Sequence, residues 1–201
     1  IAKKYTKNVQ YHEFVNVMQQ RIWALSQITT EWTLVLDSDE WVSEELQQKI
    51  LAIIMNPTSK SFYTIRRQSY FFGKLFKHCG WHRDYNLRLY RTKDGEYEPR
   101  HAHEKMQVTG PVGQIHESMY HNAYDTLDDY FVTFQKYTTW GAQDAFERGK
   151  RARLIDLTLR PILRFFKMYV LRHGFLDGLH GAVLCGLGAF NVSIKYTKLW
   201  Q

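Results

Sequence analysis

The sequence predicts an α/β fold, and two observations lead to that prediction. A helical pattern over 14–28 precedes a short apolar run at 32–36, which is followed by an acidic turn at 37–40 and a second helical pattern after Ser43. A continuous apolar strand, unlike one in which apolar and polar residues alternate, is typical of a parallel sheet that is covered on both faces. The alternation of helix and strand therefore indicates a layered α/β domain.

Each predicted element in the first half has its own local signal. Ser43 is suited to capping the second helix, and Asn56-Pro57 stops it. The segments 61–72 and 85–91 are rich in aromatic and β-branched residues, and they predict two strands. The first helix is predicted from apolar residues at helical spacing: Phe14, Met18, Ile22 and Leu25.

The second half of the chain is predicted to be helical. Gly110-Pro111 and Gly113 indicate turns, after which helical patterns cover 127–137 and 154–171. Pro161 lies inside the last of these and fits only at a first turn or a kink.

Composition excludes several classes of protein. The 201 residues are 44% hydrophobic and 15% aromatic, which is far too apolar for a disordered chain. Cys79 and Cys185 are the only cysteines, so they cannot build a disulfide framework or a four-cysteine zinc site. The default compartment is reducing, and we expect a cytoplasmic protein.

The net charge of +7 comes mostly from one segment. Residues 147–172 hold 8 basic and 2 acidic residues. On a helix, one face would carry Arg153, Arg160, Arg164 and Lys167, and another would carry Ile155, Leu159, Ile162, Phe166 and Val170. Such a basic amphipathic helix is typical of proteins that lie on an anionic membrane surface, although a solvated helix packed on the catalytic domain is the alternative.

The stretch 178–194 favours the membrane interpretation. It contains no Asp, Glu, Lys or Arg, but glycines and polar residues interrupt it, and it is short for a membrane span. We therefore expect peripheral attachment. A nucleic-acid-binding module is the second class of function that the charge allows, but the chain lacks the signature of an RRM, KH or helix-turn-helix domain, and we expect no nucleic-acid partner.

Asp37 and Asp39 directly follow the predicted buried strand. Being two residues apart, they point to the same side of an extended chain, at the sheet edge where open α/β sheets bind ligands. Paired carboxylates there suit Mg²⁺ or Mn²⁺, which can neutralise a diphosphate. The alternative is a solvated turn before the next helix. Haloacid-dehalogenase-type phosphatases share an Asp-x-Asp pattern but require Thr or Val where Trp41 stands.

Residues 32–40, with Ser43-Glu44-Glu45-Leu46 after them, resemble the metal-binding segment of family 2 inverting glycosyltransferases with the GT-A fold. Further segments resemble, in order, the branch that adds glucose to the lipopolysaccharide inner core: Gly80-Trp81, 87–91, His103-Glu104, His121 with Tyr124, and 174–178. The resemblance covers nearly the whole chain. It implies a GT-A-like (Rossmann-like) mixed sheet in residues 1–125 and a helical, amphipathic, membrane-associating extension in residues 126–201. A complete GT-A domain begins with two βα units, so we expect an amino-terminal truncation.

The resemblance also implies roles for particular residues. Asp39 would be the main metal ligand, Asp37 would contact the ribose or a metal-bound water, and Glu104 would be the general base. His121 would supply a late metal or diphosphate contact, and Arg88 would steady the phosphates or the acceptor. Further substrate contacts are expected from four residues: Trp81, His103, Gln20 and Arg21. Ile22 follows Arg21 where the family often has Asn, so the sequence departs from the family pattern at the position of an expected donor contact.

Several of these residues have a second interpretation. Glu104 could be an exposed strand residue, with Glu117 and Asp84 as the next candidates for the base, and Arg88 could be a structural ion-pair partner. His101 and His103 could suggest zinc, but the His-Glu-x-x-His spacing of zinc proteases is absent.

The sequence therefore predicts a divalent-metal-dependent glycosyltransferase. It would move a hexose, glucose in the branch it resembles, from a nucleotide sugar such as a UDP-sugar to a lipid-linked saccharide. We expect it at the cytoplasmic face of the inner membrane. A catalytically inactive, membrane-associated remnant is the remaining alternative.

Overall fold

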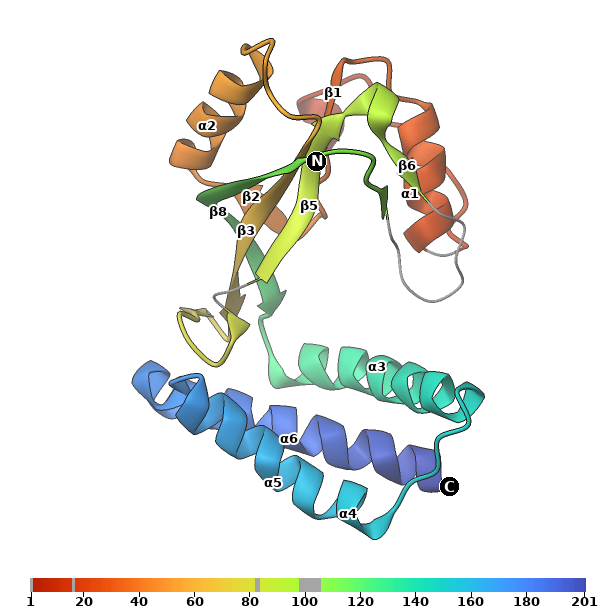
Figure 1. Cartoon of the computed structure of the whole chain (residues 1–201), viewed down its shortest axis with the longest axis vertical. Coiled ribbons are helices and arrows are strands. Elements are labelled where there is room, and N and C mark those ends of the chain that lie inside the picture. The colour runs from red at the N-terminus through yellow and green to blue at the C-terminus, as the bar shows by residue number, and fades with distance from the viewer. Residues whose placement is uncertain (1, 16, 82–83, 98–105) are drawn as a thin grey trace. The chain divides into compact units, whose positions relative to one another are not determined.

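The computed structural model describes residues 2–15, 17–81, 84–97 and 106–201 (Figure 1). The chain divides into two compact units. Unit 1 is made of Ile1–Val35, Leu51–Thr64 and Leu87–Gln114. Unit 2 is made of Leu36–Ile50, Ile65–Asn86 and Ile115–Gln201.

Helices and strands alternate through the first two thirds of the chain, and helices form the last third. The elements up to residue 124 are η1 (Ala2–Lys4), α1 (Val17–Ser26), β1 (Trp32–Leu34), β2 (Glu40–Val42), α2 (Glu44–Ile54), β3 (Phe62–Phe71), β4 (Lys74–Leu75), β5 (Asp84–Arg91), η3 (Thr92–Asp94), β6 (Glu96–Tyr97), β7 (Met106–Gln107) and β8 (Val112–Tyr124). The later elements are α3 (Leu127–Glu147), α4 (Leu154–Leu157), α5 (Leu159–Phe166), the π-helical turn η4 (Lys167–Leu171), η5 (Gly174–Asp177) and α6 (Gly178–Trp200).

The strands build one main sheet in the order β1-β5-β3-β8-β2, with β4 paired to the end of β3. β1 and β5 are antiparallel, as are β2 and β8, and β6 and β7 form a separate two-stranded sheet. The predicted α/β class is confirmed, and the architecture is compatible with a Rossmann-like glycosyltransferase fold.

The apolar strand predicted at 32–36 differs from the expectation in its setting. β1 is only three residues long, stands first in the sheet order, and runs antiparallel to β5. Of its residues only Thr33 is buried. The Trp32 ring lies under the guanidinium of Arg91, whose central carbon is 4.7 Å from the ring centre. Its apolar side chains are therefore partly covered by neighbouring side chains, and the inference of a strand covered on both faces in a parallel sheet was wrong here.

Two local sequence signals, Ser43 and Pro161, are confirmed by the positions of the helices that contain or follow them. The Ser43 hydroxyl accepts the backbone N–H of Leu46 at 3.1 Å, so it caps α2 as predicted. The predicted helix 154–171 is broken into α4, α5 and η4, and Pro161 lies in the first turn of α5, where a missing N–H is tolerated. The turn predicted at Gly113 was wrong: Gly113 lies within β8, where a Cβ would collide with the ring of Tyr63.

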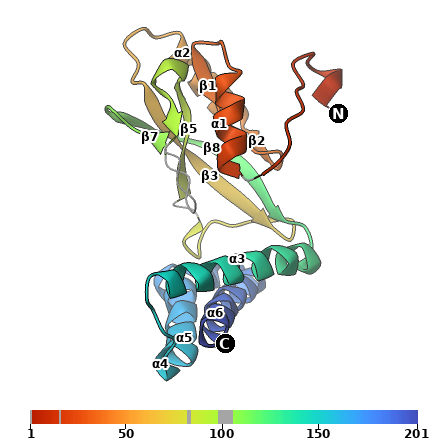
Figure 2. The ribbon, with the colours of Figure 1, turned by 90° about the vertical axis from the view of Figure 1, so that its right-hand side faces the viewer.

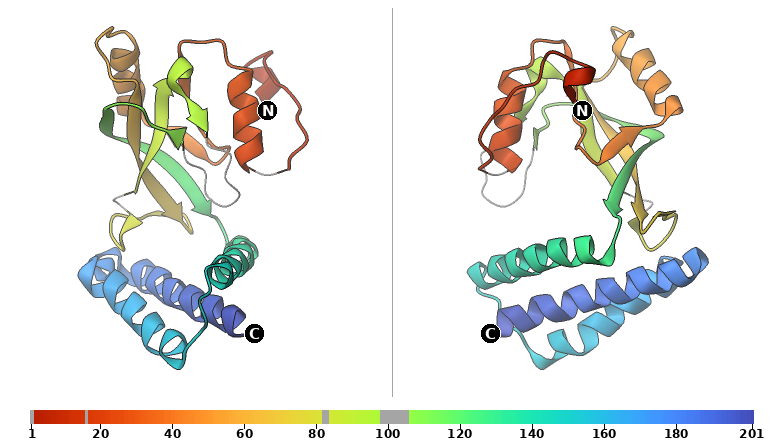
Figure 3. Two further views of the ribbon diagram at one scale, coloured as in Figure 1. Left: turned by 45° about the vertical axis from the view of Figure 1, so that its right-hand side comes forward. Right: turned by 180° about the vertical axis from the view of Figure 1, so that it is seen from behind.

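The helices of unit 2 form a layered bundle. β8 leads into α3, and α6 packs against both α3 and α5, between which it lies (Figures 2 and 3). The ammonium group of Lys198 near the end of α6 donates to the carbonyl of Gln135 and the hydroxyl of Thr138 on α3, at 3.1 and 2.8 Å. The core of this unit is formed by eight buried residues: Phe71, Phe76, Cys79, Tyr130, Phe134, Met168, Leu184 and Cys185.

Candidate functional site

The two aspartates of the acidic turn lie between β1 and β2. The backbone N–H of Glu40 donates to the carbonyl of Asp37 at 3.0 Å, and the N–H of Asp37 donates to the Glu40 carboxylate, also at 3.0 Å. These reciprocal hydrogen bonds close the turn. The Glu40 side chain is completely buried, whereas that of Asp39 is 49% exposed. The turn thus fixes Asp39 with its carboxylate open to ligands.

The pairing of β2 with β8 brings His121 to Asp39. Glu40 lies directly opposite His121 in the antiparallel register, and the N–H of Asn122 donates to the carbonyl of Asp39 at 2.9 Å. The Asp39 Oδ2 atom is 3.4 Å from His121 Nε2. The two residues to which the resemblance assigns metal contacts therefore lie side by side.

The other ring nitrogen of His121 is held by β3. Its Nδ1 lies 3.1 Å from the Ser69 hydroxyl oxygen. Burial lowers the pKa of His121, and the nearby Arg67 acts in the same direction, against the opposing influence of Asp39 and Glu40. A neutral imidazole has a lone pair available to a cation. When Nδ1 donates to Ser69, that lone pair is on Nε2, which faces the Asp39 carboxylate.

Arg67 supports the site from β3. Its guanidinium pairs with the buried Glu40 carboxylate at 3.4 Å and with Asp84 at 2.7 Å, and Asn86 donates to the other Asp84 oxygen at 3.1 Å. Arg67 thus ties the acidic turn to the start of β5. Asp84, one of the alternative bases, is engaged in this ion pair.

The donor atoms fit a divalent ion. Adjacent ligands of an octahedral ion with bonds of about 2.1 Å are separated by about 3 Å, which is close to the Asp39–His121 separation of 3.4 Å. The carboxylate suits Mg²⁺ or Mn²⁺, and the imidazole adds a nitrogen donor of the kind that transition-metal ions accept. Within the described residues, no three carboxylate, imidazole or thiol groups gather closely enough to hold a metal by themselves. Such a two-ligand site matches the way Mg²⁺ is bound by few protein groups together with substrate phosphates.

The chain is 26% identical over 184 residues to "Lipopolysaccharide core biosynthesis glycosyltransferase LpsC" of Rhizobium meliloti, an alignment that covers 90% of the chain and 68% of the relative. It is 23% and 22% identical over 210 residues to uncharacterized glycosyltransferases of Rickettsia conorii and Rickettsia felis, each covering 99% of the chain and 74% of the relative. No family model matches.

The chain is thus similar to glycosyltransferases over nearly its whole length. The glycosyltransferase resemblance drawn from its motifs is thereby confirmed, and the name of the Rhizobium relative agrees with the lipopolysaccharide-core branch that the motifs resemble. The acidic turn with Asp39 and His121 is consequently the candidate active site of a glycosyltransferase.

The other predicted site residues of this glycosyltransferase are placed as follows. Arg88 lies in β5 of unit 1 with 5% of its surface exposed, and its carbonyl accepts the N–H of Val35 at 2.8 Å. Gln20 and Arg21 lie in α1 of unit 1, where the Gln20 amide oxygen is 3.0 Å from His12 Nδ1. Their substrate contacts stay predictions.

Trp81 packs into the core of unit 2. Its ring meets Phe71 edge-on at 6.0 Å and lies 6.2 Å from Phe76. This packing gives Trp81 a structural role, whether or not it also contacts substrate. The predicted base Glu104 and its neighbour His103 lie outside the described residues.

The Gly174–Asp177 segment, one of the motifs that carry the resemblance, has a structural role. The buried Asp177 carboxylate accepts the backbone N–H of His78 at 3.0 Å and lies 3.1 Å from the His78 imidazole. The Asp177 carbonyl also accepts from the Lys74 ammonium at 2.6 Å. Asp177 therefore fastens η5, at the start of α6, to the segment that follows β3.

Sequence reasoning missed an aromatic cluster that lies next to the acidic turn. Trp41 of β2 stacks on Tyr70 of β3 with ring centres 5.7 Å apart, and Tyr120 of β8 lies 5.7 Å from Trp41. Because side chains alternate along strands, this cluster lies on the sheet face opposite to His121 and Arg67. The local sequence carried no signal for it, since it depends on the pairing of three strands.

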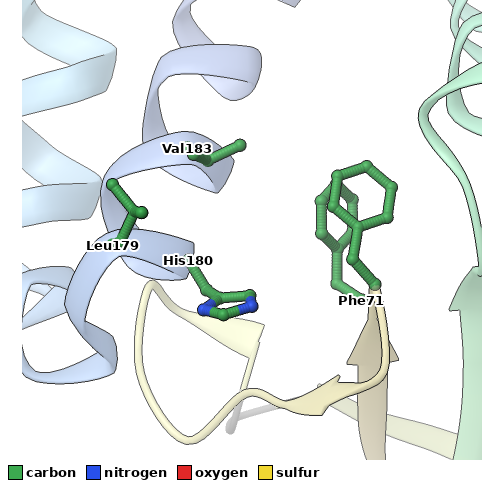
Figure 4. A pocket seen from close by; sticks show the side chains of 5 residues that line it. Phe71, Leu179, His180 and Val183 are labelled. Carbon is green, nitrogen blue, oxygen red and sulfur yellow. The ribbon is translucent and has the colours of Figure 1, made fainter.

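A small pocket lies at the start of α6. It has a volume of about 170 Å³ and is lined by apolar groups from the end of β3 and from α6, with the His180 ring at one side (Figure 4). The lining residues are Phe71, Phe72, Leu179, His180 and Val183. Such a lining suits an apolar group and offers little to a diphosphate.

Proposed function

We propose that this glycosyltransferase moves a hexose, glucose in the branch it resembles, from a UDP-sugar to a lipid-linked saccharide such as lipopolysaccharide core, with inversion at the anomeric carbon. The observation that carries the proposal is the Asp39–His121 pair, 3.4 Å apart, in a homologue of glycosyltransferases. The named function of the Rhizobium relative supports a lipopolysaccharide acceptor, and the ordered motifs support family 2.

Asp39 and His121 would hold Mg²⁺ or Mn²⁺, and Asp37 would contact the ribose or a water on the ion. When bound, the ion supplies positive charge to the departing diphosphate. The Asp39 carboxylate is half-exposed, and burial lowers the pKa of His121, which favours the neutral imidazole that a metal ion requires.

The displacement needs one proton to be removed. The acceptor hydroxyl oxygen forms a bond to the anomeric carbon while the bond from that carbon to the diphosphate oxygen breaks on the opposite face. Glu104 takes the hydroxyl proton, and Arg88 steadies the phosphates or the acceptor. Trp81, His103, Gln20 and Arg21 contribute substrate contacts in this proposal.

A lipid-linked acceptor places the reaction at the cytoplasmic face of the inner membrane, to which the protein would attach peripherally. By length and composition alone, one stretch of the described residues, Gly174–Trp200, could cross a membrane, and 22% of its most apolar window is buried. The packing of α6 between α3 and α5, with Lys198 bonded to α3, supports a bundle lying on the surface.

The test compares Asp39→Asn with Asp128→Asn in the purified protein. Asp128 is an exposed carboxylate in the first turn of α3, outside the acidic turn in the sequence, and serves as the matched control. Binding of UDP is measured by calorimetry with and without Mn²⁺. We expect Mn²⁺ to strengthen UDP binding in the wild type and in the control. In Asp39→Asn, the affinity for UDP in the presence of Mn²⁺ should be about tenfold or more lower.

Glucose transfer from UDP-glucose to a deacylated core saccharide follows with the same three proteins. Transfer that needs no divalent ion, or a Mn²⁺ effect on UDP binding that survives in Asp39→Asn, would overturn the proposal.

A further inference from the structure

Helix α5 has two apolar sides, of which only one is used by the fold. Phe165, and Met168 in the following turn, pack into the core of unit 2. On the other side, Ile162 is 64% exposed and Phe166 is 50% exposed. Four large apolar side chains of α5 point away from the core: Leu159, Ile162, Leu163 and Phe166. An apolar strip of this kind is unusual on a surface that faces only water.

Exposed apolar side chains also lie before and after α5 in the chain. Before it, Leu154 is 77% exposed in α4, and after it Leu179 is 79% exposed at the start of α6. The exposed apolar residues between these ends are Ile155, Val170, Leu171, Phe175 and Leu176. We call these residues, with the four of α5, the apolar strip. Leu179 also lines the small apolar pocket of about 170 Å³ (Figure 4).

Basic residues border the strip along one side. The three basic residues Arg160, Arg164 and Lys167 lie in α5 and in the turn η4 that follows it. Because they are spaced by four and three residues, they share one side of the helix, next to the side that carries the apolar strip. Arg160 and Lys167 are exposed, and Arg164 is half-buried. A cationic border beside an exposed apolar strip is the pattern of helices that lie in the surface of an anionic bilayer.

A basic pocket of about 440 Å³ lies at the α4 end of the strip. Its lining contains Lys150, Arg151, Arg153 and Arg160, and Asp156 is the one carboxylate that lines it among the described residues. Asp156 is buried and ion-paired with Arg160, whose guanidinium also donates to the Tyr196 hydroxyl at 2.8 Å. Arg160 is thus held in place, and the pocket has a clear surplus of positive charge.

We infer that the apolar strip inserts into an anionic phospholipid bilayer and that the basic pocket binds the phosphate of a lipid headgroup. Guanidinium and ammonium groups suit phosphate oxygens, and the exposed Leu154 and Ile155 adjoin the pocket, as acyl chains adjoin a headgroup. A bilayer is the occupant that satisfies both the apolar and the cationic surfaces at once.

This inference rests on the proposed function. It names the surface through which the enzyme would reach a lipid-linked acceptor. Its test uses neither donor nor metal. A failure of vesicle binding therefore leaves the transferase proposal standing, and a failure of Mn²⁺-dependent UDP binding leaves the bilayer inference standing.

The first arm measures co-sedimentation of the full chain with two kinds of vesicle, phosphatidylcholine alone and an equal mixture of phosphatidylcholine and phosphatidylglycerol. We expect strong binding to the mixed vesicles and weak binding to the neutral ones. The double variant Ile162→Glu/Phe166→Glu should bind about tenfold or more weakly. The control is Val132→Glu on α3, where Val132 is 71% exposed outside the strip, and it should bind as the wild type does.

The second arm tests the pocket with Lys150→Ala/Arg153→Ala against Lys136→Ala, which removes an exposed lysine of α3. The pocket variant should lose most of the preference for phosphatidylglycerol, and the control should keep it. Inorganic phosphate is added as a competitor at constant ionic strength, and we expect little displacement from the vesicles.

Circular dichroism establishes that each variant is folded. The inference is overturned if wild-type protein binds both vesicles equally or neither, if Val132→Glu weakens binding as much as the strip variant does, or if inorganic phosphate releases the protein.

Discussion

Replacing Asp177 by alanine tests how the carboxy-terminal helices are fastened to the segment after β3. The Asp177 carboxylate has 5% of its side chain exposed, and it accepts the backbone N–H of His78 at 3.0 Å. Leaving a largely buried donor without its acceptor costs about 1–3 kcal/mol. The bond to the His78 imidazole, which is 30% exposed, adds about 1 kcal/mol or less after screening by water.

The expected loss of unfolding free energy for Asp177→Ala is therefore about 1–4 kcal/mol. For a chain of this length that corresponds to a fall in melting temperature of roughly 2–15 °C. Asp177→Asn retains one acceptor oxygen for the His78 N–H, so it should lose about half as much free energy.

Urea denaturation followed by tryptophan fluorescence measures the effect. Asp125→Ala is the control, because Asp125 is exposed and accepts one hydrogen bond from Asn122, at 2.8 Å; it should change stability by about 0.5 kcal/mol or less. The reasoning is refuted if Asp177→Ala is as stable as Asp125→Ala.

Three further predictions concern stability and are checked by the same denaturation assay. Gly181→Ala should destabilise the protein, because a Cβ at position 181 would collide with the carbonyl of Gly174. Gly186→Ala should stabilise it by about 0.5–1 kcal/mol, because the space around that position in α6 is open. Equal effects of the two substitutions would contradict the close packing at Gly181. Thr126→Ala should cost about 1 kcal/mol, because the Thr126 hydroxyl accepts the N–H of Asp129 as the cap of α3, and an unchanged midpoint would show that the cap is dispensable. Arg67→Met should cost about 2 kcal/mol by removing the cation beside the fully buried Glu40 carboxylate, and Arg67→Lys should recover part of it; a fully stable Arg67→Met would show that this pair does not hold the acidic turn.

The sequence predicted those parts of the fold whose signals are local. Ser43 marked the start of α2, and Pro161 indicated that the long helical pattern near the carboxyl end is interrupted or restarted close to that residue. Strand β8 escaped prediction because it is rich in polar residues and contains Gly113. Its position in the sheet depends on β3 and β2, which are distant in the sequence.

The candidate site shows the same division. Asp39 and His121 were each predicted as ligands, but their proximity results from the register of β2 against β8, which no local pattern encodes. Arg67, which pairs with the turn, was not predicted at all, since an arginine in a strand carries no distinguishing signal before its partners are placed.

Anomalous scattering from Mn²⁺ in crystals grown with UDP tests the central claim most directly. The account predicts a single strong peak within about 2.0–2.3 Å of an Asp39 carboxylate oxygen, with His121 Nε2 and the diphosphate oxygens also in its coordination shell. Bound UDP with its Mn²⁺ peak away from Asp39 would contradict the account.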